Sequence, residues 1–142
     1  LAWNDEAHLL GSAFWPGALT LVLHDSRSIF PPGIRSKSDK VAVRVSSNPI
    51  VQRILKKLGT PLTSTSVNYP GELPAKSTSE VGEVVRRLKG KDIMLIDAGT
   101  LPISEPSTIV DCTVKPLEVL RKGKVQISNL AEVIPELHGK AI

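Results

Sequence analysis

The sequence is poor in cysteine and in aromatic residues. Its 142 residues include a single cysteine, Cys112, and only two Phe, two Trp and one Tyr. One cysteine cannot form an intrachain disulfide, which fits a reducing compartment and leads us to expect a cytoplasmic protein. With so few aromatic side chains, the core must be built from Val, Ile, Leu and Ala, which suits buried strands packed under helices.

Long hydrophobic runs are also lacking. The longest apolar run, at residues 18–23, is far too short to span a bilayer, and no charged segment followed by an apolar one resembles a signal peptide. We therefore expect no contact with a membrane. The chain starts with Leu1 and opens directly into a helical pattern, so we also expect it to be the remainder of a longer protein.

Motifs of several large enzyme classes are missing. The sequence has no GxxxxGK phosphate loop, no GxGxxG dinucleotide motif and no GxSxG nucleophile elbow. The three histidines, His8, His24 and His138, do not show the spacing of metal ligands. We therefore predict no metal site made by protein side chains, and we cannot assign a catalytic residue from motifs of these classes.

The charge is modestly basic. The formal net charge is +4 and the sequence pI is near 9.4. Excess positive charge can attract anions such as nucleotides or RNA. The alternative is a solvated basic surface without a specific partner, because the lysines are scattered along the chain.

Hydrophobic periodicity predicts alternating strands and helices. We expect helices over residues 4–13, 49–58, from 77 to a stop at Gly90, and 129–137. We expect strands over residues 19–24, 41–45, 61–65, 93–96, 108–113, 117–120 and 124–127. This alternation predicts the α/β class, and the length suits a single domain over residues 1–142.

Two groups of polar residues could bind a ligand from the middle of the chain. Ser64 lies at the end of the strand predicted at 61–65, and Ser66 and Asn68 follow it, where hydroxyl and amide groups could reach phosphate or ribose oxygens. The alternative is a turn that satisfies its own backbone. Arg44 alternates with three valines in the strand predicted at 41–45, so its guanidinium could hold a carboxylate; the alternative is a solvated sheet face.

Two further residues stand at strand boundaries near the C-terminus. Ser107 enters the strand predicted at 108–113 and could present a hydroxyl to a ligand, or it could simply cap the strand start. Arg121 precedes Gly123 and could reach a phosphate, or it could lie at a basic hairpin tip. Cys112 lies within an apolar strand and is expected to be an inert core residue.

The order and spacing of these residues resemble the YrdC-like family of threonylcarbamoyl-AMP synthases. The blocks that carry the resemblance are FWPGALTL at 14–21, VAVRV at 41–45, NPI at 48–50, GTPL at 59–62 with TSVN at 65–68, STIVD at 107–111 and LRKG at 120–123. Ala18 and Ser46 stand where the family has proline, and Ala98 where it has glycine. The family's Lys-x-Arg signature, expected upstream of the first block, occurs nowhere in the 142 residues.

The resemblance implies a fold and a set of roles. It implies an open, twisted mixed sheet flanked by helices, of which this chain holds the C-terminal two-thirds and lacks the N-terminal portion. Ser66, Asn68 and Arg121 would bind ATP, while Arg44, Ser107 and, with less support, Ser64 would bind L-threonine.

The resemblance also implies a reaction and its participants. The family joins L-threonine, bicarbonate and ATP, with Mg²⁺ bridging phosphates, into threonylcarbamoyl-AMP for tRNA modification, and works beside other tRNA-modification proteins. Without Lys-x-Arg we expect this chain alone to be inactive. Two alternatives remain: a module of the same fold that binds double-stranded RNA or tRNA, and a carbamoyltransferase domain that handles carbamoyl-adenylate.

Overall fold

The computed structural model describes residues 1–87 and 93–137. Gly90 and His138 lie outside the described residues. The chain divides into two compact units: the sheet unit, Leu1–Pro61 with Glu105–Ile142, and the loop unit, Leu62–Ser104. The single domain over residues 1–142 stays a prediction.

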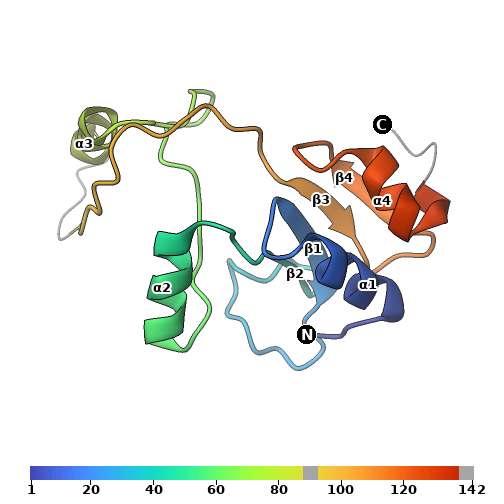
Figure 1. Ribbon diagram of the computed structural model, residues 1–142. Coiled ribbons are helices and arrows are strands. Elements are labelled where there is room, and N and C mark those ends of the chain that lie inside the picture. The colour runs from blue at the N-terminus through green and yellow to red at the C-terminus, as the bar shows by residue number, and fades with distance from the viewer. Residues whose placement is uncertain (88–92, 138–142) are drawn as a thin grey trace. The chain divides into compact units, whose positions relative to one another are not determined.

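The sheet unit is built on a four-stranded mixed sheet (Figure 1). Its strands are β1 (Leu19–His24), β2 (Lys40–Val43), β3 (Thr108–Asp111) and β4 (Glu118–Arg121), in the spatial order β2-β1-β3-β4. β1 runs antiparallel to β2 and parallel to β3, and β4 runs antiparallel to β3. The expected open mixed α/β sheet is thereby confirmed.

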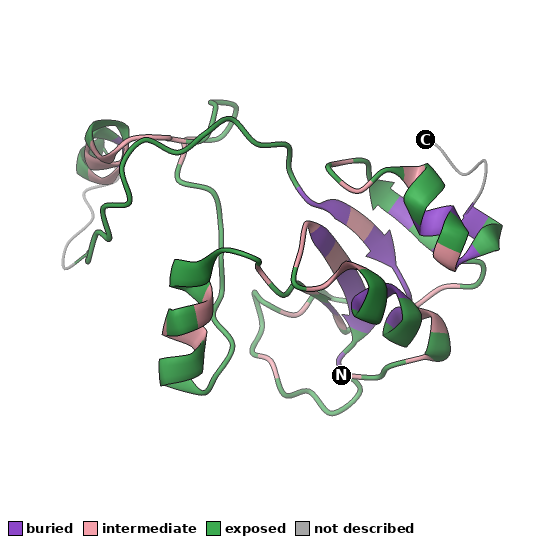
Figure 2. Cartoon of the chain, in the orientation of Figure 1, coloured by how far each residue is buried: buried purple, intermediate pink, exposed green. Residues whose placement is uncertain are grey.

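One face of the sheet carries the hydrophobic core. Alternation along β1 turns Leu19, Leu21 and Leu23 to this face, and each is fully buried. Figure 2 shows buried residues, in purple, concentrated in the strands of the sheet. Helices α1 (Asp5–Phe14) and α4 (Ile127–Val133) contribute to the same core, together with the short 3₁₀ helix at Pro135–Leu137. Burying one leucine side chain in this way contributes roughly 1.5–3 kcal/mol.

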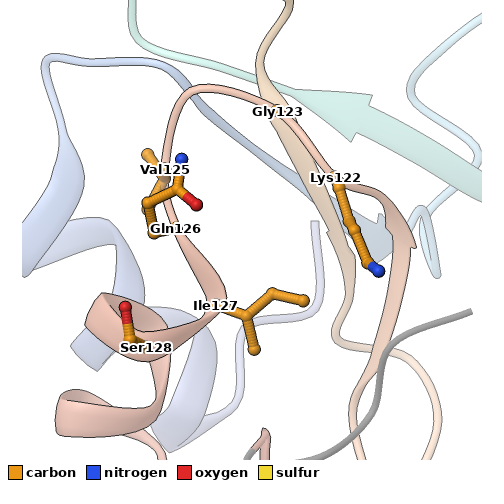
Figure 3. Close-up of a pocket in the computed structure, with 6 residues that line it drawn as sticks. All are labelled: Lys122, Gly123, Val125, Gln126, Ile127 and Ser128. Atoms are coloured by element: carbon orange, nitrogen blue, oxygen red, sulfur yellow. The ribbon is translucent and has the colours of Figure 1, made fainter.

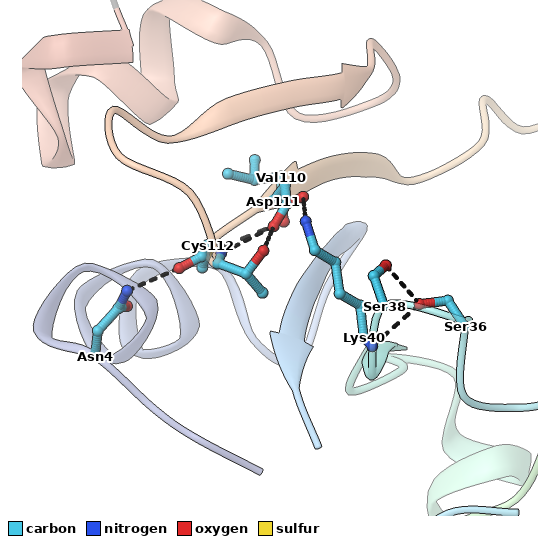
Figure 4. Close-up of polar contacts among 8 residues, drawn as sticks. Asn4, Ser36, Ser38, Lys40, Val110, Asp111 and Cys112 are labelled. Carbon is cyan, nitrogen blue, oxygen red and sulfur yellow. Dashed lines mark hydrogen bonds and ion pairs between the residues drawn. The ribbon is translucent and has the colours of Figure 1, made fainter. Parts of the chain in front are cut away.

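Asn4 joins α1 to the sheet. Its Oδ1 accepts a hydrogen bond from the N–H of Ala7 at 2.9 Å, which caps the helix. Its Nδ2 donates to the carbonyl oxygen of Cys112 at 2.8 Å, just beyond β3 (Figure 4). One side chain thus fixes both the start of α1 and its position against the end of β3.

The other helices follow their expected signals. α2 (Pro49–Leu58) begins after Asn48, whose Oδ1 accepts from the N–H groups of Ile50 and Val51, and ends at Gly59, whose φ is 66°. This left-handed backbone conformation favours glycine, because glycine has no Cβ atom. In the loop unit, α3 (Thr78–Arg87) follows Ser77, whose hydroxyl accepts a hydrogen bond from the N–H of Glu80. The Glu80 carboxylate in turn accepts one from the N–H of Lys76.

The strand expected at 41–45 is shorter than predicted. β2 ends at Val43, so Arg44 lies one residue past the strand, and Val45 is 36% exposed instead of forming part of the core. The carbonyl of Val45 accepts a hydrogen bond from Gly17, which lies outside β1, at 2.8 Å. The regular pairing of β1 with β2 therefore ends at Val43, although the alternation of apolar residues continues to Val45.

Four other strand predictions and the last helix need correction. Residues 61–65 and 93–96 form no strand, and Leu62 and residues 93–96 are exposed, because a short apolar run becomes a strand only where a neighbouring strand pairs with it. Residues 124–127 are a loop followed by the start of α4, and the backbone of Val125 exchanges hydrogen bonds with the Thr108 side chain. β3 ends at Asp111 instead of residue 113, and the expected last helix starts at Ile127 and gives way to the 3₁₀ turn.

No helix among residues 1–87 and 93–137 is both long and apolar enough to cross a membrane.

A buried ion pair joins the two strands that flank β1. Lys40 Nζ lies 2.7 Å from Asp111 Oδ2, and Asp111 is only 4% exposed (Figure 4). The other carboxylate oxygen accepts hydrogen bonds from the N–H and hydroxyl of Thr113 at 2.8 and 2.6 Å. Burial acts to raise the pKa of Asp111, but the hydrogen bonds from Lys40 and Thr113 outweigh it, and the pKa lies below the usual aspartate value.

We predict that Lys40→Met lowers the free energy of unfolding at pH 7 by about 2 kcal/mol, because Asp111 keeps its buried charge without its partner. The lowered pKa means that the carboxylate stabilises the fold above the usual aspartate pKa of about 4 and loses this effect as the pH falls through its lower folded value. Urea unfolding measures the difference in the free energy of unfolding between wild type and Lys40→Met. This difference should be smaller in the acid range, below about pH 4, than at pH 7.

Lys37→Met is the control, since Lys37 is exposed and forms no ion pair within the described residues. Equal stabilities of Lys40→Met and Lys37→Met at pH 7 would contradict a stabilising role of the pair.

Candidate functional site

The candidate site begins on the second face of the sheet, opposite the core. The alternation that buries Leu19, Leu21 and Leu23 turns Thr20 to this second face, and Ile109 is its partner on β3. Both side chains are half-buried. Ser107, just before β3, is 7% exposed and points its hydroxyl to that of Thr20, with the two oxygens 2.8 Å apart.

Arg121 clamps Ser107 in place. Its Nε and Nη2 donate to the carbonyl oxygen of Ser107 at 3.0 and 2.8 Å, and Nη2 also donates to the Ser107 hydroxyl at 3.1 Å. The register between β3 and β4 shifts between Ile109 and Val110, and such an irregularity re-aims neighbouring side chains. The result is a hydroxyl whose position is set by a fixed cation.

Two glycines of the sequence blocks allow these close approaches. A Cβ on Gly123 would lie 2.3 Å from the carbonyl oxygen of Pro106 and 2.8 Å from the nitrogen of Thr108. A Cβ on Gly17 would lie 2.1 Å from the carbonyl oxygen of Phe14. A larger residue at position 123 would displace the backbone around Ser107, and one at position 17 would displace the turn after α1 whose Gly17 carbonyl binds Arg44.

Arg44 lies at the end of β2 and is exposed. Its Nε donates to the carbonyl oxygen of Gly17 at 2.7 Å, which fixes the plane of the guanidinium. Within the described residues, its two terminal amino groups have no hydrogen-bond partner. A planar group with two free donors can hold a carboxylate or phosphate through two parallel hydrogen bonds.

The other predicted residues belong to the loop unit. Ser64 and Ser66 are exposed and follow no strand, so their expected place at a strand end is wrong. Asn68 Nδ2 donates to the carbonyl oxygens of Tyr69 and Glu72 at 2.9 and 3.2 Å, which closes its own loop. Its Oδ1 is buried and has no partner among the described residues. That Ser66 and Asn68 share a cavity with Arg121 stays a prediction.

A hollow of about 280 Å³ opens where β4 leads into α4 (Figure 3). It is lined by Lys122, Gly123, Val125, Gln126, Ile127 and Ser128. None of the six predicted ligand-binding residues lines it. A smaller hollow, of about 70 Å³, lies in the loop unit between α3 and residues 95–101.

The side chains brought together here are hydroxyl and guanidinium groups, which suit ligand binding. They contain no group of three His, Cys, Asp or Glu side chains that could hold a metal ion. Burial, with a smaller effect from the charge of Asp111, raises the pKa of Cys112 to about 12, so this thiol stays protonated and inert, as expected. The fixed hydroxyls and guanidinium groups can instead bind an anionic ligand and stabilise developing charge.

Thr20 is the one member of this cluster that sequence reasoning did not select. The signal for it was present, since Thr20 lies in the FWPGALTL block and is the polar residue between buried neighbours in β1. Finding it required the parallel pairing of β1 with β3, which brings Thr20 beside Ser107 across 87 positions of sequence.

We predict that Gly123→Ala destabilises the protein by about 1–3 kcal/mol, because the added methyl group must displace the backbone of residues 106–108. Gly82→Ala is the control: its Cβ would meet nothing within 4 Å, and alanine in a helix interior should stabilise by up to about 1 kcal/mol. Urea unfolding measures both. Two substitutions with the same effect would show that the close approach at Gly123 is unimportant.

Sequence and structure comparisons point to one family. The family model Sua5_yciO_yrdC, described as telomere recombination, matches residues 2–123. A threonylcarbamoyl-AMP synthase of Pyrococcus abyssi is 33% identical over an alignment of 144 residues, gaps included. The alignment covers 97% of this chain and 41% of that protein. A threonylcarbamoyl-AMP synthase of Vibrio cholerae is 40% identical over 111 residues, which cover 78% of this chain and 56% of that protein.

Solved structures agree. P. abyssi Sua5 complexed with L-threonine matches with a TM-score of 0.82 and 31% identity, over 100% of this chain and 42% of that one. E. coli YciO matches with a TM-score of 0.71 and 29% identity, over 89% of this chain and 60% of that one. The chain thus spans 41–60% of the length of these relatives. With its matched residues, its mixed sheet and its six sequence blocks, the chain belongs to the Sua5/YciO/YrdC family.

Proposed function

We propose that the sheet unit provides the L-threonine site of a threonylcarbamoyl-AMP synthase. The observation that carries the proposal is the guanidinium of Arg44, fixed through Nε on Gly17 while its terminal amino groups have no partner in the described residues. This arrangement suits the carboxylate of an amino acid, because a planar fork pre-set in orientation loses little entropy on binding. Support comes from P. abyssi Sua5, 31% identical and solved with L-threonine.

The hydroxyl groups would supply the neutral part of the site. Ser107 is buried and clamped, so it would offer a hydrogen bond to the amino or hydroxyl group of threonine at a fixed position. Ser64, exposed in the loop unit, is the weaker candidate for the same ligand. A site that hydrogen-bonds a substrate hydroxyl discriminates strongly against analogues without it.

ATP would be the second substrate, with Arg121, Ser66 and Asn68 as its ligands. Arg121 uses Nε and Nη2 on Ser107, and its Nη1 has no partner in the described residues, which suits a phosphate oxygen. The buried Oδ1 of Asn68, without a donor in the described part of the chain, suits an N–H or O–H group of the nucleotide. Mg²⁺ would be held mainly by ATP phosphates and water, as is usual for this ion.

In the proposed reaction, the amino group of L-threonine condenses with bicarbonate to a carbamate with loss of water. A carboxylate oxygen of the carbamate then displaces pyrophosphate from the α-phosphorus of ATP, and the threonylcarbamoyl-AMP formed would serve tRNA modification. The residues of this chain would contribute by positioning and by charge stabilisation. Arg44 would orient the amino acid, and Arg121 would link the two substrates through Ser107. Because the 142 residues contain no Lys-x-Arg, binding of threonine is the property to test in this chain.

We predict that Arg44→Lys weakens L-threonine binding by roughly tenfold to hundredfold, the loss of a charged hydrogen bond worth about 1.5–3 kcal/mol. An ammonium group keeps the charge but cannot reproduce two parallel hydrogen bonds. Isothermal titration calorimetry with L-threonine measures the change, and ATP affinity without threonine should remain the same.

Arg53→Lys is the matched control, because Arg53 is exposed on α2 and belongs to none of the six sequence blocks. Threonine affinities that are equal in wild type, Arg44→Lys and Arg53→Lys would mean that Arg44 is a surface residue with no part in the site.

A further inference from the structure

Thr20 has a hydroxyl group whose hydrogen bonding is only partly used. Its Oγ1 lies 2.8 Å from Ser107 Oγ, and either atom could be the donor. In the described residues this is its only side-chain hydrogen bond. The side chain is half-buried on the second face of the sheet, between two fully or nearly fully buried neighbours, Leu19 and Leu21.

The clamp by Arg121 sets the direction of this hydrogen bond. A guanidinium can only donate, so Arg121 occupies a lone pair of the Ser107 hydroxyl at 3.1 Å. A hydroxyl that accepts from a cation becomes a better donor, and chains of hydrogen bonds that run in one direction strengthen one another. The favoured chain therefore runs from Arg121 to Ser107 to Thr20, and the proton of Thr20 is left at its open end.

The register between β1 and β2 brings the backbone of Thr20 close to that of Arg44. The antiparallel ladder pairs Leu21 with Val43, so Thr20 and Arg44 are each one residue beyond this pair, toward the same end of the two strands. Both alternate with residues of the core face, since Leu21 and Val43 pack against the core. The regular ladder ends at this pair, but Arg44 stays at this end of β1, because its Nε donates to the carbonyl oxygen of Gly17 at 2.7 Å.

We infer that Thr20 is a further substrate-binding residue, whose hydroxyl donates to the same carboxylate that Arg44 holds. This inference rests on the proposed function and extends it, because it names the ligand atom and a residue outside the predicted set. The carboxylate of the amino acid receives two N–H donors from Arg44 and one O–H donor from Thr20. Arg121 acts on the same carboxylate at a distance, by polarising Ser107 and through it Thr20.

The test compares Thr20→Val with Thr20→Ser by calorimetry of the chain with L-threonine. Valine keeps the size and β-branching of the side chain but removes the hydroxyl, whereas serine keeps the hydroxyl and removes the methyl group. We expect Thr20→Val to bind L-threonine about tenfold more weakly and Thr20→Ser to bind within about threefold of wild type. Thermal unfolding of each variant checks that the sheet is intact.

A second readout reports on the ligand atom itself. With L-threonine labelled with ¹³C at the carboxyl group, the bound carboxyl resonance should move in Thr20→Val and stay in place in Thr20→Ser. An unchanged affinity and resonance in Thr20→Val, or an equal loss in both variants, would overturn the role of the hydroxyl. If the wild-type chain binds no L-threonine, the proposed function fails first, and the inference about Thr20 falls with it.

Discussion

The hold of Arg121 on Ser107 is the interaction on which the candidate site depends. Three hydrogen bonds from one guanidinium fix both the carbonyl oxygen and the hydroxyl of Ser107. Gly123 allows the segment after β4 to pack closely against residues 106–108, where a Cβ atom would clash with the backbone. Arg121 pairs with Ile109, next to the point where the register between β3 and β4 shifts. A structural clamp and a ligand-binding surface are thus made by the same atoms.

The two faces of the sheet divide stability from binding. Leucines and valines on one face pack against α1 and α4, which supplies most of the hydrophobic stabilisation. The second face carries polar groups that are costly to bury unless they are paired, and each has its partner: Lys40 with Asp111, and Thr20 with Ser107. Within the described residues, the terminal amino groups of Arg44 have no partner, and the inferred direction of the hydrogen-bond chain leaves the proton of Thr20 free. Their positions at one end of β1 and β2 define where an anionic ligand would sit.

Sequence patterns predicted the elements that carry strong local signals. The capped helices at Asp5–Phe14 and Pro49–Leu58 and the strand Leu19–His24 formed as expected, because caps, glycine stops and periodicity act within a few residues. The apolar runs at 61–65 and 93–96 failed as strands, since a strand needs a partner that local sequence does not specify. For the candidate site, the six sequence blocks identified Arg44, Ser107 and Arg121. The contacts of Ser107 with Thr20 and Arg121 depend on strand order, which sequence alone leaves open.

We propose that L-threonine binds at the end of β1 and β2 with its carboxylate on Arg44. A crystal structure of the chain grown with L-threonine tests this most directly. We expect the carboxylate oxygens to lie within hydrogen-bond distance of the terminal amino groups of Arg44 and the hydroxyl of Thr20, with Ser107 facing the rest of the amino acid. Threonine bound instead in the hollow between β4 and α4, with Arg44 facing solvent, would contradict it.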